Sequence, residues 1–207
     1  MPYDLDIPGW MPETELKVIE VLARTIPPGG AMLEVGSFCG RSSWCWARSV
    51  HPGVSVTCID IWDPDEHPYA PPARLGTAAG ADFGRVADMG DCRGTLENFA
   101  RYTRDCPNIR ALRGRSPDDF LDWPERSLDL VFLDGVHHNP VFRADVIHWY
   151  ARVRPGGVLC GDDCAESHPD VRPTLEAFCG RLGIRFTVAG RLWMLQRPLE
   201  PPGTLPK

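Results

Sequence analysis

The chain has 207 residues, of which 43% are hydrophobic and 24% are charged, so it can bury a substantial core and is not disordered as a whole. The formal net charge is −6 and the acids are scattered without a basic cluster, which argues against a nucleic-acid partner. No apolar run is long enough to span a bilayer, and the acidic first residues do not resemble a signal peptide. We therefore expect a cytoplasmic protein with no membrane partner.

The eight cysteines include no C-x-x-C pair, and several lie in apolar stretches. Without an export signal a disulfide framework is not expected, so most of the thiols are predicted to be buried as small hydrophobic groups.

The first expected element is a helix over residues 13–26, which Thr14 could cap and the Pro27-Pro28-Gly29-Gly30 run would end. Apolar residues recur there at roughly helical spacing. The expected inward residues are Leu16, Ile19, Val21, Leu22 and Ile26.

A short apolar strand over residues 31–35 leads into a glycine-bearing turn with the spacing Glu34-x-Gly36-x-x-x-Gly40, and a helix should begin near Arg41 or Ser42. Glycines after a strand let the backbone approach a ligand, and the N-terminus of the next helix offers free N–H groups to an anion. The turn therefore indicates a nucleotide-type ligand, with a plain tight turn as the alternative.

The next strand, over residues 54–60, ends in Asp60. An acid about twenty residues past a glycine turn suits hydrogen bonding to ribose hydroxyls, and a helix-capping role is the alternative. Residues 62–90 are rich in Pro, Gly and Ala, which predicts a lid-like insertion or a variable loop. Side chains that could line a pocket from this segment are Trp62, His67, Tyr69 and Phe83.

A helix is expected over residues 95–104, with Leu96 and Phe99 inward, followed by a strand over residues 109–113. Arg115 and Ser116 follow that strand, where they would meet the base of a nucleoside held at Asp60. The alternative for Ser116 is an N-cap, with a proline at the first helical position.

Residues 128–163 read as a buried strand ending at Asp134, an amphipathic helix, a Pro-Gly-Gly turn and a second strand ending at Asp162 and Asp163. A right-handed crossover would bring the two carboxyl ends side by side. Three carboxylates there suit Mg²⁺, with Mn²⁺ or Ca²⁺ open, and His137 is the expected general base. The alternatives are a cofactor-side acid for Asp134, a helix cap for Asp162 and a loop position for His138.

The remaining chain predicts a helix over residues 170–182, two short strands on either side of Gly190 that form an edge hairpin, and a loose tail over residues 197–207. Strands alternating with helices predict one α/β domain with a mostly parallel sheet, preceded by an N-terminal arm over residues 1–12.

Five stretches together resemble class I S-adenosylmethionine-dependent methyltransferases: LEVGSFCGRSS, CIDIWD, LRGRSPDDF, LDLVFLDGVHHNPVFRADVIHWY and RPGGVLCGDD. They are most similar to small-molecule O-methyltransferases and cephalosporin-hydroxylase-like proteins of natural-product biosynthesis, over about residues 12 to 196. The resemblance implies a Rossmann-like, doubly wound sheet of seven strands in the order 3-2-1-4-5-7-6, with an antiparallel C-terminal hairpin, as a single domain over residues 1–207.

The resemblance also implies roles for individual residues. Residues implied at the cofactor are Glu34, Gly36, Ser37, Gly40, Asp60, Arg115, Ser116 and Asp134. Metal-dependent macrolide-sugar methyltransferases of this group imply Asp134, Asp162 and Asp163 as metal ligands and His137 as base. His138 and Trp62 are expected near the substrate.

The expected function is metal-dependent methylation of a hydroxyl on a small molecule, with a sugar or natural-product intermediate favoured and a catechol or phenol as the alternative. A non-methylating cofactor-binding protein and a nicotinamide-dependent dehydrogenase are further alternatives, although the turn lacks the G-x-G-x-x-G spacing of the latter. Homo-oligomerisation stays open.

Overall fold

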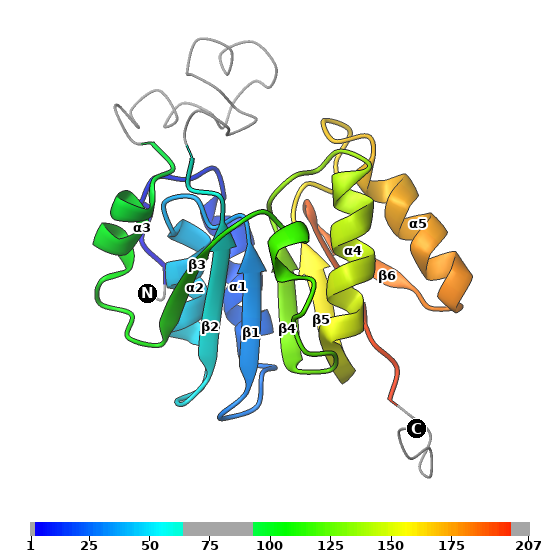
Figure 1. Cartoon of the computed structure of the whole chain (residues 1–207), viewed down its shortest axis with the longest axis horizontal. Coiled ribbons are helices and arrows are strands. Elements are labelled where there is room, and N and C mark those ends of the chain that lie inside the picture. The colour runs from blue at the N-terminus through cyan, green and yellow to red at the C-terminus, as the bar shows by residue number, and fades with distance from the viewer. Residues whose placement is uncertain (1–2, 64–92, 200–207) are drawn as a thin grey trace.

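The computed structural model describes residues 3–63 and 93–199, and the structural statements below concern those residues. The predictions for residues 64–92 and for the end of the tail lie outside them. Seven strands form one sheet in the order β3-β2-β1-β4-β5-β7-β6 (Figure 1), which confirms the expected fold. The strands are β1 (Ala31–Val35), β2 (Ser55–Asp60), β3 (Ile109–Arg113), β4 (Leu128–Leu133), β5 (Val153–Gly161), β6 (Phe186–Ala189) and β7 (Leu192–Gln196).

Neighbouring strands from β3 to β5 pair in parallel, and β7 pairs antiparallel with both β5 and β6, which confirms the edge hairpin. The helices are α1 (Glu13–Ala23), α2 (Arg41–Ser49), α3 (Leu96–Thr103), α4 (Val141–Arg152) and α5 (Val171–Leu182), with a short 3-10 helix over Asp118–Phe120.

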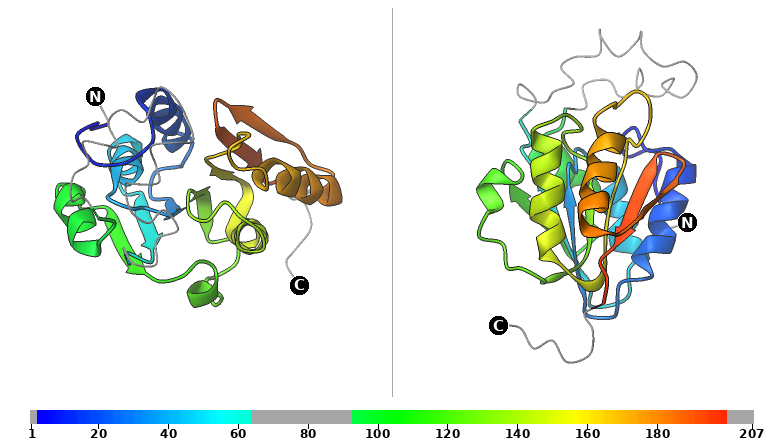
Figure 2. Two further views of the ribbon diagram at one scale, coloured as in Figure 1. Left: turned by 90° about the horizontal axis from the view of Figure 1, so that it is seen from above. Right: turned by 90° about the vertical axis from the view of Figure 1, so that its right-hand side faces the viewer.

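Helices cover both faces of the sheet, as Figure 2 shows, and alternate residues of the central strands point into the two cores. In β1, Met32 packs with α1 and α2, whereas Leu33 packs on the other face, with α4 and α5. In β4, Phe132 and Val131 divide in the same way. Because both faces are buried, these strands read as continuous apolar runs in the sequence.

Three local predictions are wrong. Thr14 does not cap α1, because the helix begins at Glu13 and the carbonyl of Pro12 accepts its first hydrogen bonds. Val21 is 67% exposed, since it lies roughly 200° around the helix from the buried Ile19. Leu96 is the first residue of α3 and is 40% exposed, and Phe99 takes the inward position.

The Pro-Gly-Gly sequence also differs from the expected turn, since β5 begins before it and the register against β4 shifts between Leu128 and Leu130. The seven cysteines in the described part of the chain are all free and buried, as predicted. Within the same residues, no helix is both long and apolar enough to cross a membrane.

Gly36 permits a close approach between the ends of β1 and β4. Its φ is +87°, and a Cβ atom at this position would lie 2.2 Å from the carbonyl oxygen of Asp134. Its N–H donates to the carbonyl of Ile59 in β2, which fixes the turn from the other side. A side chain here would meet backbone atoms, which cannot move aside without separating the strands.

The Gly36→Ala substitution should therefore lower the free energy of unfolding by about 2–4 kcal/mol, from steric overlap and the positive φ together. Urea unfolding of the purified protein measures it. Gly180→Ala is the matched control, because Gly180 lies in α5 with open space around it, and there alanine should stabilise by roughly 0.5–1 kcal/mol. Equal stability of Gly36→Ala and wild type would contradict the steric argument.

Candidate active site

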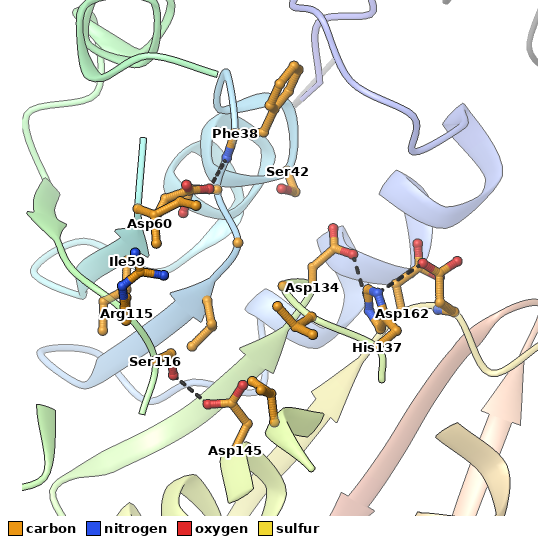
Figure 3. Close-up of a pocket in the computed structure, with 18 of the residues that line it drawn as sticks. Phe38, Ser42, Ile59, Asp60, Arg115, Ser116, Asp134, His137, Asp145 and Asp162 are labelled. Atoms are coloured by element: carbon orange, nitrogen blue, oxygen red, sulfur yellow. Dashed lines mark hydrogen bonds and ion pairs between the residues drawn. The ribbon is translucent and has the colours of Figure 1, made fainter. Parts of the chain in front are cut away.

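One cavity of about 610 Å³ runs along the carboxyl ends of the central strands (Figure 3). We call its first part the glycine-loop half, which is lined by Gly36, Ser37, Phe38, Asp60 and Ser116. We call its second part the acidic rim, which is lined by Asp134, His137, Asp162, Asp163, His168 and Arg191. The position agrees with the general rule that open α/β sheets bind ligands where the strand order reverses, here between β1 and β4.

Backbone pairing beyond the strand ends brings the acids of the rim together, as predicted. The N–H of Asp134 donates to the carbonyl of Val35 at 2.8 Å, and the N–H of Asp162 donates to the carbonyl of Leu133 at 3.1 Å. Asp134 and Asp162 therefore continue the ladder of β1, β4 and β5 by one residue. Asp163 follows with φ +64°, a left-handed conformation that turns the chain out of the sheet.

Two residues expected at the cofactor shape the loop and do not line the cavity. Glu34 is fully buried and accepts hydrogen bonds from the hydroxyls of Ser37, at 2.7 Å, and Ser43. Burial raises the pKa of this carboxyl. Gly40 is the left-handed N-cap of α2, where a Cβ atom would lie 2.7 Å from Thr103.

Asp60 lies at the cavity wall, as predicted, and its carboxylate also holds the surrounding loops. One oxygen accepts from the N–H of Phe38 and the other from the N–H of Trp62, each at 2.8 Å. Trp62 is only 3% exposed, packs against Phe99 and donates its indole N–H to the carbonyl of Phe38. Its side chain therefore belongs to the core, away from the position expected for a substrate contact.

Ser116, which is half-buried, forms a polar cluster with two buried residues of α4. Its hydroxyl donates to Asp145 at 2.5 Å and accepts from the indole N–H of Trp149 at 2.8 Å, so it is not a helix cap. Burial raises the pKa of Asp145 to about 6. Arg115 is exposed beside it and also lines the cavity. Sequence reasoning missed Asp145, although an acid on the inward, apolar side of a predicted helix is a recognisable signal.

The N-terminal segment closes one side of the cavity. The guanidinium group of Arg41, the first residue of α2, donates to the carbonyls of Leu5, Ile7 and Met11. This holds residues 8–11 against the cavity, which they line.

Within the rim, His137 is the most enclosed side chain that the sequence singled out. It is 4% exposed, with Nδ1 at 3.3 Å from Asp163 and Nε2 at 3.9 Å from Asp134. Neither ring nitrogen has a hydrogen-bond partner within the described part of the chain. Burial lowers the pKa of His137 to about 4, so the ring is neutral.

Arg191, in the turn between β6 and β7, was not predicted and is the cation of the rim. It donates twice to Glu15 of α1, at 2.9 and 3.0 Å, and lies 3.3 Å from both Asp162 and Asp163. Burial, together with Glu15 and Asp163, nevertheless raises the pKa of Asp162 to about 7. Burial and the charges of Asp162 and Asp163 also raise the pKa of Asp134 well above its usual range.

His168 was also missed, and His138 is not in the cavity. His168 lies in the loop after β5, with Nδ1 at 3.4 Å from Asp163. The side chain of His138 is largely exposed and lies 3.9 Å from Asp170. Of the described residues, His137, Asp163 and His168 form the group whose ligand atoms lie within 4.8 Å of one another. The expected trio of Asp134, Asp162 and Asp163 shares the rim but is not that group.

A family model described as "Methyltransferase domain" matches residues 33–164. Among solved structures, a protein from Corynebacterium glutamicum is 16% identical with a TM-score of 0.65, covering 95% of this chain and 86% of its own. The O-methyltransferase NovP is 17% identical with a TM-score of 0.64, and the match covers 89% of this chain and 80% of NovP. A methyltransferase from Geobacter sulfurreducens is 15% identical with a TM-score of 0.61, and the match covers 91% of this chain and 80% of that protein. No curated protein sequence matches significantly.

The fold and the matching family model together identify a class I methyltransferase. The chain belongs to the methyltransferase family of the matching model and is an S-adenosylmethionine-dependent enzyme.

The raised pKa of Asp145 predicts a pH-dependent stability difference. Between about pH 4 and pH 6 the folded protein keeps a proton that the unfolded chain releases, so the stability of wild type falls as the pH rises through this window. Asp145→Asn cannot ionise and still accepts from Ser116. Without cofactor, it should gain on the order of 1–3 kcal/mol relative to wild type between pH 4.5 and pH 7.5.

Urea unfolding at the two pH values measures this difference. Asp122→Asn is the control, because that carboxylate is exposed. The same stability difference at both pH values would show that Asp145 does not titrate in the folded state as described.

Proposed function

We propose that the enzyme methylates a hydroxyl group of a small molecule, a sugar or natural-product intermediate, with a divalent cation bound at the acidic rim. The observation that carries this proposal is that one cavity joins the glycine-loop half to a rim of carboxylates and an imidazole. A methyl donor in the first part and a hydroxyl in the second would then share one enclosed space, in which positioning and exclusion of water accelerate the transfer.

The cofactor would occupy the glycine-loop half. Asp60 would accept hydrogen bonds from the ribose hydroxyls, since each of its oxygens keeps a lone pair beyond the backbone N–H it already accepts. Arg115 and Ser116 would lie at the adenine, and Gly36 and Ser37 at the methionine part. Because Gly36 touches the backbone of Asp134, the sulfonium end of the cofactor would face the rim.

The rim fits a divalent cation, because four carboxylates around one guanidinium group leave negative charge to be offset. The carboxylates are those of Glu15, Asp134, Asp162 and Asp163, and the guanidinium is that of Arg191. A bound cation would polarise the acceptor hydroxyl and lower its pKa. Of the acids expected as ligands, Asp162 fits least well, since one oxygen accepts from the N–H of Asp163 and the other faces Arg191.

We favour Asp134, in its ionised form, as the group that takes the proton from the hydroxyl. A cation at the rim would offset the charges of Asp162 and Asp163 that help to raise the pKa of Asp134, and so would favour its carboxylate. The sequence predicts His137 for this role, but that side chain is only 4% exposed, whereas the side chain of Asp134 is 24% exposed. Asp134 also lies at the junction of the two parts of the cavity, beside Gly36. An acceptor hydroxyl facing the methyl group would reach Asp134 before His137.

Asp134→Asn should therefore lower turnover by about 10²-fold or more, the usual contribution of a general base, and leave the affinity for S-adenosylmethionine within a few fold of wild type. Methyl transfer is assayed across sugar and phenolic acceptors, and cofactor binding by calorimetry. Asp122→Asn is the matched control at an exposed position.

Three outcomes would count against parts of the proposal. If Asp134→Asn keeps its turnover and His137→Ala loses it, the general base is His137 and not Asp134. Turnover that EDTA leaves unchanged would refute the cation. If the enzyme methylates phenols and no sugar hydroxyl, the acceptor is a phenol and the proposed sugar class is wrong.

A further inference from the structure

We propose that His137, Asp163 and His168 bind one divalent transition-metal ion of the zinc type, in preference to Mg²⁺. This inference deepens the proposed function, on which it rests for the role of a cation at the rim. It names a ligand set that contains two imidazoles and differs from the carboxylate trio that the sequence suggests.

The spacing of the three side chains fits a metal better than it fits hydrogen bonds. Oδ2 of Asp163 lies 3.3 Å from Nδ1 of His137, Oδ1 of Asp163 lies 3.4 Å from Nδ1 of His168, and the two imidazole ring centroids are 5.1 Å apart. Good N–H···O hydrogen bonds are about 2.7–3.2 Å long. Ligands at about 2.0–2.2 Å from a tetrahedral ion are about 3.3–3.6 Å from one another. The two contacts of Asp163 with the imidazoles have this length, and one ligand atom from each of the three residues lies within 4.8 Å of the others.

His137 gives an independent reason to expect a ligand. The residue is only 4% exposed, and neither ring nitrogen has a hydrogen-bond partner among the described residues. Leaving a buried polar group unpaired is unfavourable, so such groups in native proteins generally meet an ion, a water or a ligand. The ring nitrogen that faces Asp163 points into the three-residue cluster, where a metal ion would satisfy it.

The surroundings supply the outer contacts that metal ligands usually have. Asp163 is held by Arg191, whose NH1 atom lies 3.3 Å from it, and its own N–H donates to Asp162 at 2.6 Å. Arg191 is in turn fixed by its double hydrogen bond to Glu15. The carboxylate of Asp163 is therefore oriented before any ion arrives.

The chemistry of the set decides the class of ion. Imidazole nitrogen suits zinc, iron, cobalt and nickel, whereas Mg²⁺ prefers six oxygen ligands in a near-ideal octahedron. Two imidazoles and one carboxylate also leave coordination positions open, as catalytic zinc sites do. A hydroxyl of the acceptor could take such a position, next to Asp134.

Metal binding is tested directly on the metal-free full-length protein, by competition with a chromophoric chelator for Zn²⁺ and by calorimetry for Mg²⁺. Wild type should bind one equivalent of Zn²⁺ at least 100-fold more tightly than Mg²⁺. His168→Ala should weaken Zn²⁺ binding at least 30-fold, while Asp162→Asn should change it less than about 5-fold. His51→Ala, at an exposed histidine outside the cavity, is the matched control.

Cobalt substitution distinguishes this site from zinc capture by the cysteines. The Co²⁺ protein should show visible bands without a sulfur-to-cobalt charge-transfer band, and His168→Ala should lose the visible bands while keeping its affinity for S-adenosylmethionine. Undiminished Zn²⁺ binding by His168→Ala, equal affinity for Mg²⁺, or a sulfur-to-cobalt band would overturn the inference. If His168→Ala also loses cofactor binding, its loss of metal binding could come from misfolding. The Co²⁺ spectrum of His168→Gln is then the deciding measurement, and visible bands as strong as those of wild type would overturn the inference.

The two proposals fail separately. Tight Zn²⁺ binding through His168 with no methylation of any hydroxyl acceptor would refute the proposed function alone. Methyl transfer by wild type, together with undiminished Zn²⁺ binding in His168→Ala, would refute the metal site and leave methyl transfer in place.

Discussion

The parallel pairing of β1, β4 and β5 is the constraint on which the rest of the structure depends. Each strand runs one residue beyond its regular ladder, and the extra backbone hydrogen bonds set Asp134 and Asp162 side by side at the sheet edge. The approach is close enough that only glycine fits at position 36. The distance between the glycine-loop half and the acidic rim is thus fixed by backbone geometry before any side chain contributes.

Charge balance at the rim is divided between elements that are distant in the sequence. β4 and β5 bring the acids, the turn before β7 brings Arg191, and α1 brings Glu15. One guanidinium group does not neutralise four carboxylates, which explains why burial and mutual repulsion raise the pKa values of Asp134 and Asp162. Carboxyl groups with raised pKa values keep protons, which lowers the repulsion among the acids of the rim.

The sequence predicts what depends on short-range patterns. Apolar runs and turn residues locate the strands, and the rule that parallel strands share an edge brings Asp134 to Asp162 and Asp163. Arg191 and His168 are not predictable in this way, because both lie in connecting turns whose direction depends on tertiary packing. Trp62 was misplaced for the same reason. It follows Asp60 at the sheet edge, but its ring turns back onto Phe99. Glu34 and Gly40 fit the sequence motif, but they shape the glycine-bearing loop without lining the cavity.

The pair of Glu15 and Arg191 joins residues 176 positions apart. During synthesis the N-terminal part of the chain leaves the ribosome first and the hairpin of β6 and β7 leaves last, so the acids of the rim emerge before the guanidinium that faces them. A nascent chain that has built β1, β4 and β5 therefore carries the clustered carboxylates before it carries Arg191. The catalytic edge of this enzyme becomes electrostatically complete only when the last strand has been made and has docked.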